Sequence, residues 1–132
     1  MYRTTQICKA LGIKRERFRD WIKVGDLTPT IPAEGQGTKA EYSLHDVVMI
    51  AFFKKMVERG FKRELAKKYV DAFEKEYTIE TSPKTVVFFA HYHEHDITVS
   101  KNSIPDMSAF YQDIINMESI INEVKFNLEK TS

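Results

Sequence analysis

Through most of the first half of the chain, hydrophobic residues recur at i, i+3 and i+4, the spacing that gives a helix one apolar face. The pattern predicts two short helices, over 4–12 and about 14–23, and their brief connection at Gly12 is typical of a helix-turn-helix. Two longer helices are expected further along. One is opened at Ser43 by a pattern like a capping box, and the other covers about 62–77.

Residues 28–42 break this periodicity with prolines, glycines and β-branched residues. We expect two short strands here, joined by a turn at 35–37, because glycine adopts the positive φ that a hairpin tip requires. A hairpin that follows a helix-turn-helix is the wing of a winged helix. The first half of the chain is therefore predicted to have that fold.

The pattern changes again at Ser82-Pro83, where a proline breaks the helical run. Residues 85–92 are β-branched and aromatic and 97–100 form a shorter extended run, which together predict a strand pair. The expected fold class is mainly α, with a small β element. The chain then divides into a winged helix-turn-helix domain (1–77), a β-hairpin or linker (78–104) and a dimerisation helix (105–132).

The last predicted helix carries apolar residues that are spaced alternately by three and four positions. This spacing keeps a narrow seam on one face over about three heptads, which is typical of a coiled coil. We expect the helix to pair with a second copy of the chain; the alternative is that it packs on the rest of its own chain. The seam consists of Met107, Phe110, Ile114, Met117, Ile121, Val124 and Leu128.

Composition adds a charge asymmetry that the net charge of +1 conceals. Residues 1–76 contain 16 Lys and Arg against 11 Asp and Glu, whereas residues 77–132 contain 4 against 8. A basic first half is the natural place for a polyanion to bind. The single cysteine, Cys8, excludes an internal disulfide and a thiolate metal cluster. We expect neither a signal peptide nor a membrane span, and we place the protein in the cytoplasm.

The second predicted helix has a row of positive charges beside its apolar face. Arg15, Arg19 and Lys23 stand at i, i+4 and i+8, with Lys14 and Arg17 next to them. Such a helix fits the major groove of DNA, where arginine can bind both phosphates and the O6 and N7 atoms of guanine. The pattern therefore favours a helix that reads double-stranded DNA.

Residues 2–76 resemble the start of the MerR (mercury-resistance-regulator) family of bacterial transcription factors. The matching motifs are Gly12-Ile13, Phe18-Arg19-Asp20-Trp21, Gly25-Asp26-Leu27-Thr28-Pro29, the stretch 37–43 and Gly60-Phe61. The resemblance implies a homodimeric regulator that binds specific DNA sites at the nucleoid, with RNA polymerase at the promoter as a candidate partner. We expect neither a cofactor nor an enzymatic activity, because the sequence contains no nucleophile elbow, phosphate-binding loop or metalloprotease motif.

The resemblance also implies which residues contact DNA. The position of Arg19 contacts DNA in the family, Lys39 takes the place of a wing contact, and Arg3 can reach a phosphate from the first helix. Asp20 stands where the family has a tyrosine near the phosphate backbone, and an acid there repels phosphate unless a neighbouring cation neutralises it. The candidate DNA-binding residues are Arg3, Lys14, Arg15, Arg17, Arg19, Asp20, Lys23 and Lys39.

Two alternative functions stay open. The wing has Ala40 where the family has an arginine, and together with Asp20 this departure favours a protein-interaction adaptor that reuses the fold, as in some chaperone modulators. His91, His93 and His95 alternate, so on one face of a strand they could ligate Zn²⁺ or Ni²⁺ in a metal-responsive regulator. We favour a polar cluster at a hairpin tip for these histidines, and no metal ligand is expected.

Overall fold

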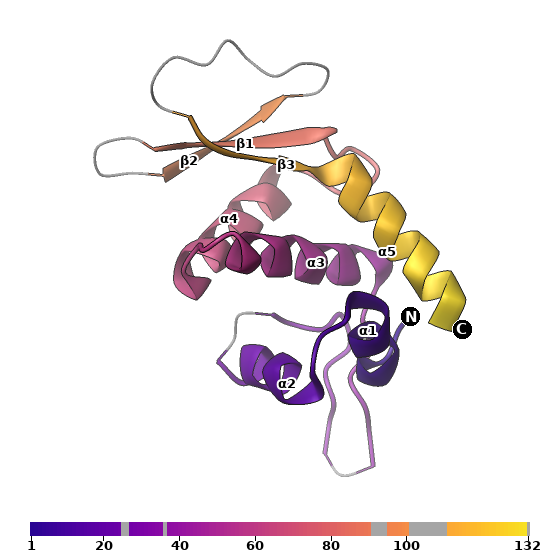
Figure 1. Ribbon diagram of the computed structural model, residues 1–132. Helices are drawn as coiled ribbons and strands as arrows, with labels where there is room; N and C mark the ends of the chain where they lie inside the picture. The colour runs from indigo at the N-terminus through magenta and orange to yellow at the C-terminus, as the bar shows by residue number, and fades with distance from the viewer. Residues whose placement is uncertain (25–26, 36, 91–94, 101–110, 132) are drawn as a thin grey trace.

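The computed structural model describes residues 1–24, 27–35, 37–90, 95–100 and 111–131, with the backbone alone for 87–90, 95–100 and 111–113. In chain order the elements are α1 (Thr4–Leu11), α2 (Arg15–Lys23), α3 (Leu44–Glu58), α4 (Arg63–Glu76), β1 (Thr85–Ala90), β2 (His95–Ser100), β3 (Tyr111–Asn116) and α5 (Met117–Thr131). Figure 1 shows α3 at the centre, between the α1–α2 pair and the layer of α4 and the sheet. The mainly α fold with a small β element is confirmed. No helix in this described part of the chain is long and apolar enough to cross a membrane.

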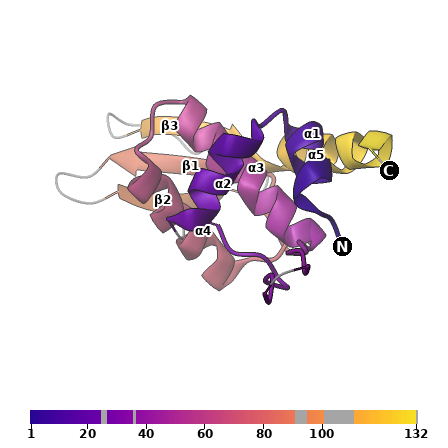
Figure 2. The same ribbon diagram turned by 90° about the horizontal axis from the view of Figure 1, so that it is seen from below.

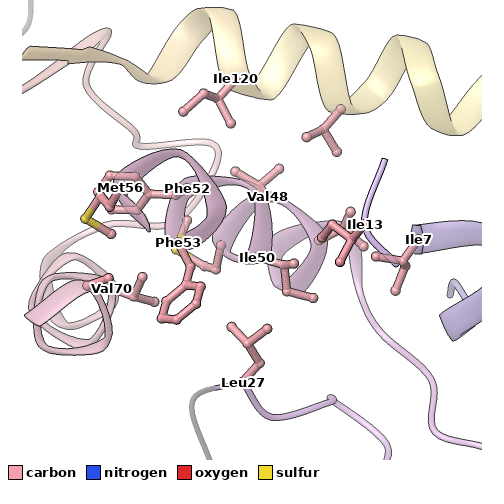
Figure 3. Packing of buried hydrophobic residues seen from close by; sticks show 14 of the residues in the cluster. Ile7, Ile13, Leu27, Val48, Ile50, Phe52, Phe53, Met56, Val70 and Ile120 are labelled. Carbon is pink, nitrogen blue, oxygen red and sulfur yellow. The ribbon is translucent and has the colours of Figure 1, made fainter. Parts of the chain in front are cut away.

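The central helix α3 is apolar on nearly every side, which is why it lies in the interior. Its buried side chains are Val47, Val48, Met49, Ile50, Phe52, Phe53 and Met56. The ring of Phe53 meets Trp21 of α2 at a centroid distance of 4.9 Å, and Phe52 meets Phe73 of α4 at 5.5 Å, both edge to face. Figure 3 shows Val48 on the side of α5. Three other helices therefore pack on this one.

The ends of the helices follow the signals in the sequence. Gly12, at φ 66°, ends α1, and Gly60, at φ 95°, follows α3, both in the left-handed region that favours glycine. The Ser43 hydroxyl oxygen accepts a hydrogen bond from the Asp46 backbone N–H at 3.1 Å, and the Asp46 carboxylate accepts one from the Ser43 N–H at 3.0 Å. The predicted capping box is thus confirmed.

The Asp46 carboxylate also holds the root of the wing. Its Oδ2 atom accepts hydrogen bonds from the backbone N–H of Thr30, at 2.9 Å, and from the Thr30 hydroxyl. The antiparallel pairing predicted for the wing is present at Ile31 and Glu41, whose backbones exchange hydrogen bonds of 3.0 and 2.8 Å. One carboxylate therefore ties the start of α3 to the first arm of the wing.

The described part of the wing contains this isolated bridge and not the two regular strands that we predicted. Proline explains the difference, because Pro29 and Pro32 have no N–H to donate to a strand ladder. The tip is as predicted, since Gly35 and Gly37 have φ values of 81° and 88°. The hydroxyl of Thr38 donates a hydrogen bond to the carbonyl of Gly35 at 2.9 Å and closes the turn.

The predicted strand pair is confirmed and belongs to a three-stranded antiparallel sheet in the order β2-β1-β3. Val86 of β1 pairs with Val99 of β2 and with Ile115 of β3. The side chains of Val86 and Ile115 are completely buried. This pair of side chains therefore faces the helical core, as expected for the inner face of a half-buried sheet.

Our prediction of a helix over 105–132 is wrong for Tyr111–Asn116, which forms the strand β3. Ile115 is completely buried whereas its neighbour Asn116 is exposed, as expected when successive side chains of a strand point to opposite faces. The adjacent β-branched residues Ile114 and Ile115 also favour extended backbone. This segment gains hydrogen bonds to β1, which the spacing of apolar residues cannot reveal.

The seam residues on α5 pack on the same chain. Three of them, Met117, Val124 and Leu128, are buried in the core, and so is Ile120, which is not part of the seam. Ile121 is partly buried, Ile114 lies in β3, and Met107 and Phe110 lie outside the described residues. Packing on its own chain, the alternative named above, is confirmed for the buried residues of α5.

Specific hydrogen bonds fix the two ends of α5. The Asn116 side-chain oxygen accepts a hydrogen bond from the Ser119 backbone N–H at 2.8 Å, and so caps the helix where β3 ends. Near the other end, the Asn127 side-chain amide donates to the carbonyl of Ala10 in α1 at 3.1 Å. Figures 1 and 2 both show α5 running from the sheet to α1. The helix therefore joins the sheet to the helix-turn-helix.

Replacing Asp46 with Ala should lower the free energy of unfolding by about 1–2 kcal/mol, because it removes the capping box of α3 and the hydrogen bonds from the exposed Thr30 to a charged acceptor. Urea denaturation followed by circular dichroism measures the change. Asp71→Ala is the matched control, since its carboxylate makes an exposed pair with Lys67 at 3.4 Å and should contribute less than about 1 kcal/mol. Equal losses in the two variants would contradict the role given to Asp46.

Replacing Leu128 with Ala should lower the free energy of unfolding by about 2–5 kcal/mol, because a buried side chain leaves a cavity. The loss should not depend on protein concentration, since the contacts lie within one chain. Asn122→Ala, at an exposed position of the same helix, should have an effect below about 0.5 kcal/mol. A loss, relative to the wild type, that changes steeply with protein concentration would place this contact between chains.

Candidate nucleic-acid interface

The helix α2 is anchored by two aromatic side chains and exposes its charges. Phe18 packs edge to face on Tyr42 at 5.6 Å, Trp21 packs in the same way on Phe53, and both anchors are almost completely buried. The exposed charged residues of the helix are Arg15, Glu16, Arg17, Arg19, Asp20 and Lys23. Figure 2 looks at this side of the molecule, where α2 lies in front of α3.

A hollow of about 880 Å³ lies between α1, α2 and the wing, and we call it the α2–wing hollow. None of the described residues that line it is acidic. Its positively charged lining residues are Arg3, Lys9, Arg15, Arg19 and Lys39. All but Lys9 were predicted from the sequence to contact DNA; Lys9 was missed because the first helix shows no row of cations. The fold thus gathers cations from three elements into one depression.

Tyr42 lines this hollow and holds the second arm of the wing against the start of α1. Its backbone exchanges two hydrogen bonds of 2.8 Å with Tyr2, and its phenol forms a hydrogen bond with the side chain of Thr4. Burial raises the pKa of Tyr42 to about 12, against the opposite effect of that hydrogen bond, so the phenol is uncharged at neutral pH. Arg3 and Glu41 form an ion pair of 3.7 Å between the same two segments. The start of α1 and the second arm of the wing are therefore held together.

The remaining cations at the start of α2 lie on its other side. A second hollow, of about 350 Å³, lies between α2 and α3, and we call it the α2–α3 hollow. Lys14 and Arg17 line it together with Lys54 and Glu58 of α3. The Arg17 guanidinium lies over the Trp21 ring, 5.4 Å from its centroid. Lys14 and Arg17, which we expected next to the row of cations, thus lie on the other side of the helix from Arg15 and Arg19.

Asp20 and Lys23 are exposed and line neither hollow. In the described part of the chain, Asp20 forms no ion pair, so neither Arg17 nor Lys23 neutralises it through direct contact. Glu16 lies one turn earlier on the same helix and is also exposed. The outward surface of α2 therefore carries two negative charges beside its cations.

The histidines of the metal hypothesis are not tested by the structure. His91 and His93 lie outside the described residues, and the backbone of His95 pairs with Ala90 in the sheet. No group of three potential ligands that could hold a metal ion occurs among the residues that are described. Cys8 is buried in α1, and burial raises the pKa of its thiol, so it is a packing residue.

The residues that line the two hollows, apart from Thr131, all lie in a range that a protein-family comparison matches. The family described as MerR HTH family regulatory protein matches residues 2–72, which is more than half of the chain. The matched range contains α1, α2, the wing, α3 and most of α4. No curated protein sequence matches the chain. Regulators of this family are typically non-enzymatic DNA-binding proteins. The chain therefore belongs to the MerR HTH family and is a DNA-binding transcriptional regulator of the helix-turn-helix class.

Proposed function

We propose that this regulator binds specific sites on double-stranded DNA by placing α2 in the major groove. The observation that supports this best is the α2–wing hollow, where cations from α1, α2 and the wing converge and no described lining residue is acidic. The major groove of B-DNA admits an α-helix, and phosphates run along both of its edges. A helix flanked by cations matches both properties.

In this proposal, some of the cationic side chains contact bases and others contact only phosphates. Arg15 and Arg19 stand one turn apart on α2 and bind base edges and the adjacent phosphates. Lys39 in the wing and Arg3 before α1 bind phosphates, which fixes the position of the protein without reading sequence. Lys23 extends the row to the end of α2.

We also propose that the protein acts as a homodimer at a promoter, beside RNA polymerase, in the bacterial cytoplasm. One short helix reads few base pairs, and two copies related by a two-fold axis read two half-sites about 34 Å apart. On α5, Ile121 is partly buried and Phe126 is 57% exposed, so both have surface left for a second copy.

One observation favours a second candidate function, that of a protein-interaction adaptor. Glu16 and Asp20 place negative charges on the outward surface of α2, where they repel phosphate. In a DNA complex, a carboxylate at this place can accept a hydrogen bond from the N4 amino group of cytosine. In an adaptor, the same carboxylates bind a cationic partner. DNA titrations of variants distinguish the two functions.

Arg19→Ala should weaken binding to the preferred duplex by about 1–3 kcal/mol and relax the preference at one position of each half-site, as expected for a base contact. Lys39→Ala should weaken binding to all duplexes about equally, because a phosphate contact carries no sequence information. Selection from random duplexes, followed by fluorescence anisotropy at several salt concentrations, measures both effects. If the two folded variants bind DNA as tightly as the wild type, the DNA proposal fails and the adaptor gains support.

Sedimentation equilibrium should show a dimer of the wild-type chain at micromolar concentration. Ile121→Asp should shift the equilibrium to monomer, since an unpaired charge in an apolar contact is costly. Circular dichroism checks that the variant keeps its helices. A wild-type chain that is monomeric over the whole concentration range, and that also binds DNA as a monomer, would contradict the homodimer.

A further inference from the structure

The helix α2 has a charged hollow on each side. The α2–wing hollow flanks it on one side, and the α2–α3 hollow flanks it on the other, with Lys14 and Arg17 in the second. An α-helix with its side chains is about 10–12 Å wide, close to the width of the major groove. A helix that fills the groove therefore has one DNA strand along each side, and each hollow faces one strand.

The α2–α3 hollow differs from the α2–wing hollow because it contains an acid. The Lys54 ammonium lies 2.8 Å from the Glu58 carboxylate, and both side chains are partly exposed to solvent. The hydrogen bond from Lys54 holds the pKa of Glu58 below its usual range, and the charges of Lys55 and Arg17 act in the same direction. Glu58 is therefore ionised at neutral pH and lies within the field of three cations.

We propose that the α2–α3 hollow receives the phosphate backbone of the second DNA strand, and that Glu58 is an internal counter-ion which occupies Lys54 in place of a phosphate. This inference rests on the proposed insertion of α2 into the major groove. It adds Lys54 of α3 to the DNA-contacting residues, which neither the family match nor the row of cations on α2 assigns. It also makes Glu58 a residue that limits affinity for DNA.

The physical consequence is a competition between a carboxylate and a phosphate for one ammonium group. When DNA enters the hollow, its phosphate must share or displace the Glu58 contact, and the two anions repel each other. A lysine that stays paired with an internal carboxylate does not neutralise a phosphate. It therefore releases no condensed counterion from the DNA and adds nothing to the salt dependence of binding. Removing the charge of Glu58 therefore frees one cation for DNA.

Glu58→Gln should tighten binding to every duplex and steepen the slope of log K against log salt concentration by about 0.9, the increment for one further phosphate contact. Adding Lys54→Gln to this variant should remove the gain and return the slope by about the same amount. Fluorescence anisotropy with one preferred and one random duplex, between about 50 and 200 mM salt, measures both quantities. Because the contact is with phosphate, the two duplexes should respond alike.

Glu118→Gln is the matched control for net charge. Glu118 pairs with Lys84 at 3.7 Å, both groups are exposed, and the pair lies where β1 and α5 begin. The substitution changes the net charge of the chain as Glu58→Gln does, yet it should leave the salt slope unchanged, because Glu118 lines neither hollow beside α2. Circular dichroism checks that each variant keeps its helices.

The outcomes separate the inference from the proposed function. If Glu58→Gln behaves like Glu118→Gln while Arg19→Ala still weakens binding, the second strand does not use this hollow, and the inference is overturned alone. If the wild-type chain binds no duplex even at low salt, the proposed function and the inference both fail. A gain in Glu58→Gln that survives the loss of Lys54 would also overturn the counter-ion role.

Discussion

The helix α3 has apolar side chains on nearly all of its sides, so it must be enclosed, and the rest of the chain is arranged to enclose it. Trp21 of α2, Phe73 of α4 and the buried stripe of α5 each cover part of it. Because Trp21 of α2 packs on α3 and Phe18 packs on Tyr42, the charged residues of α2 are left on the surface. The same burial that stabilises the fold thus determines which side of α2 is available to a polyanion.

The features that could be predicted from the sequence are those set by a few neighbouring residues. Gly12 and Gly60 end helices because of their backbone freedom, and Ser43 with Asp46 opens α3 through a local exchange of hydrogen bonds. The basic character of α2 was equally visible, because Phe18 and Trp21 fix which side of the helix is buried. The family resemblance over the first half agrees with the match over residues 2–72.

The features that could not be predicted depend on contacts between distant segments. The 3,4 spacing at the end of the chain fits a helix throughout, yet Tyr111–Asn116 pairs with β1, and the remaining seam covers α1 and α3. Likewise, Arg17 was expected beside the row of cations, but its guanidinium lies over the Trp21 ring, on the other side of α2. Lys54 and Glu58 form an ordinary i, i+4 pair in the sequence, and only the packing of α2 beside α3 brings them to the hollow that we propose receives DNA.

The central claim is that duplex DNA binds where α1, α2 and the wing meet. A titration of the ¹⁵N-labelled protein with a short duplex, followed by nuclear magnetic resonance, tests it residue by residue. The account predicts that the largest shifts occur at Arg3, Arg15, Arg19 and Lys39, while the backbone near Phe126 on the outer side of α5 stays unchanged. Shifts concentrated on α5 or on the sheet, with α2 and the wing unaffected, would contradict the account.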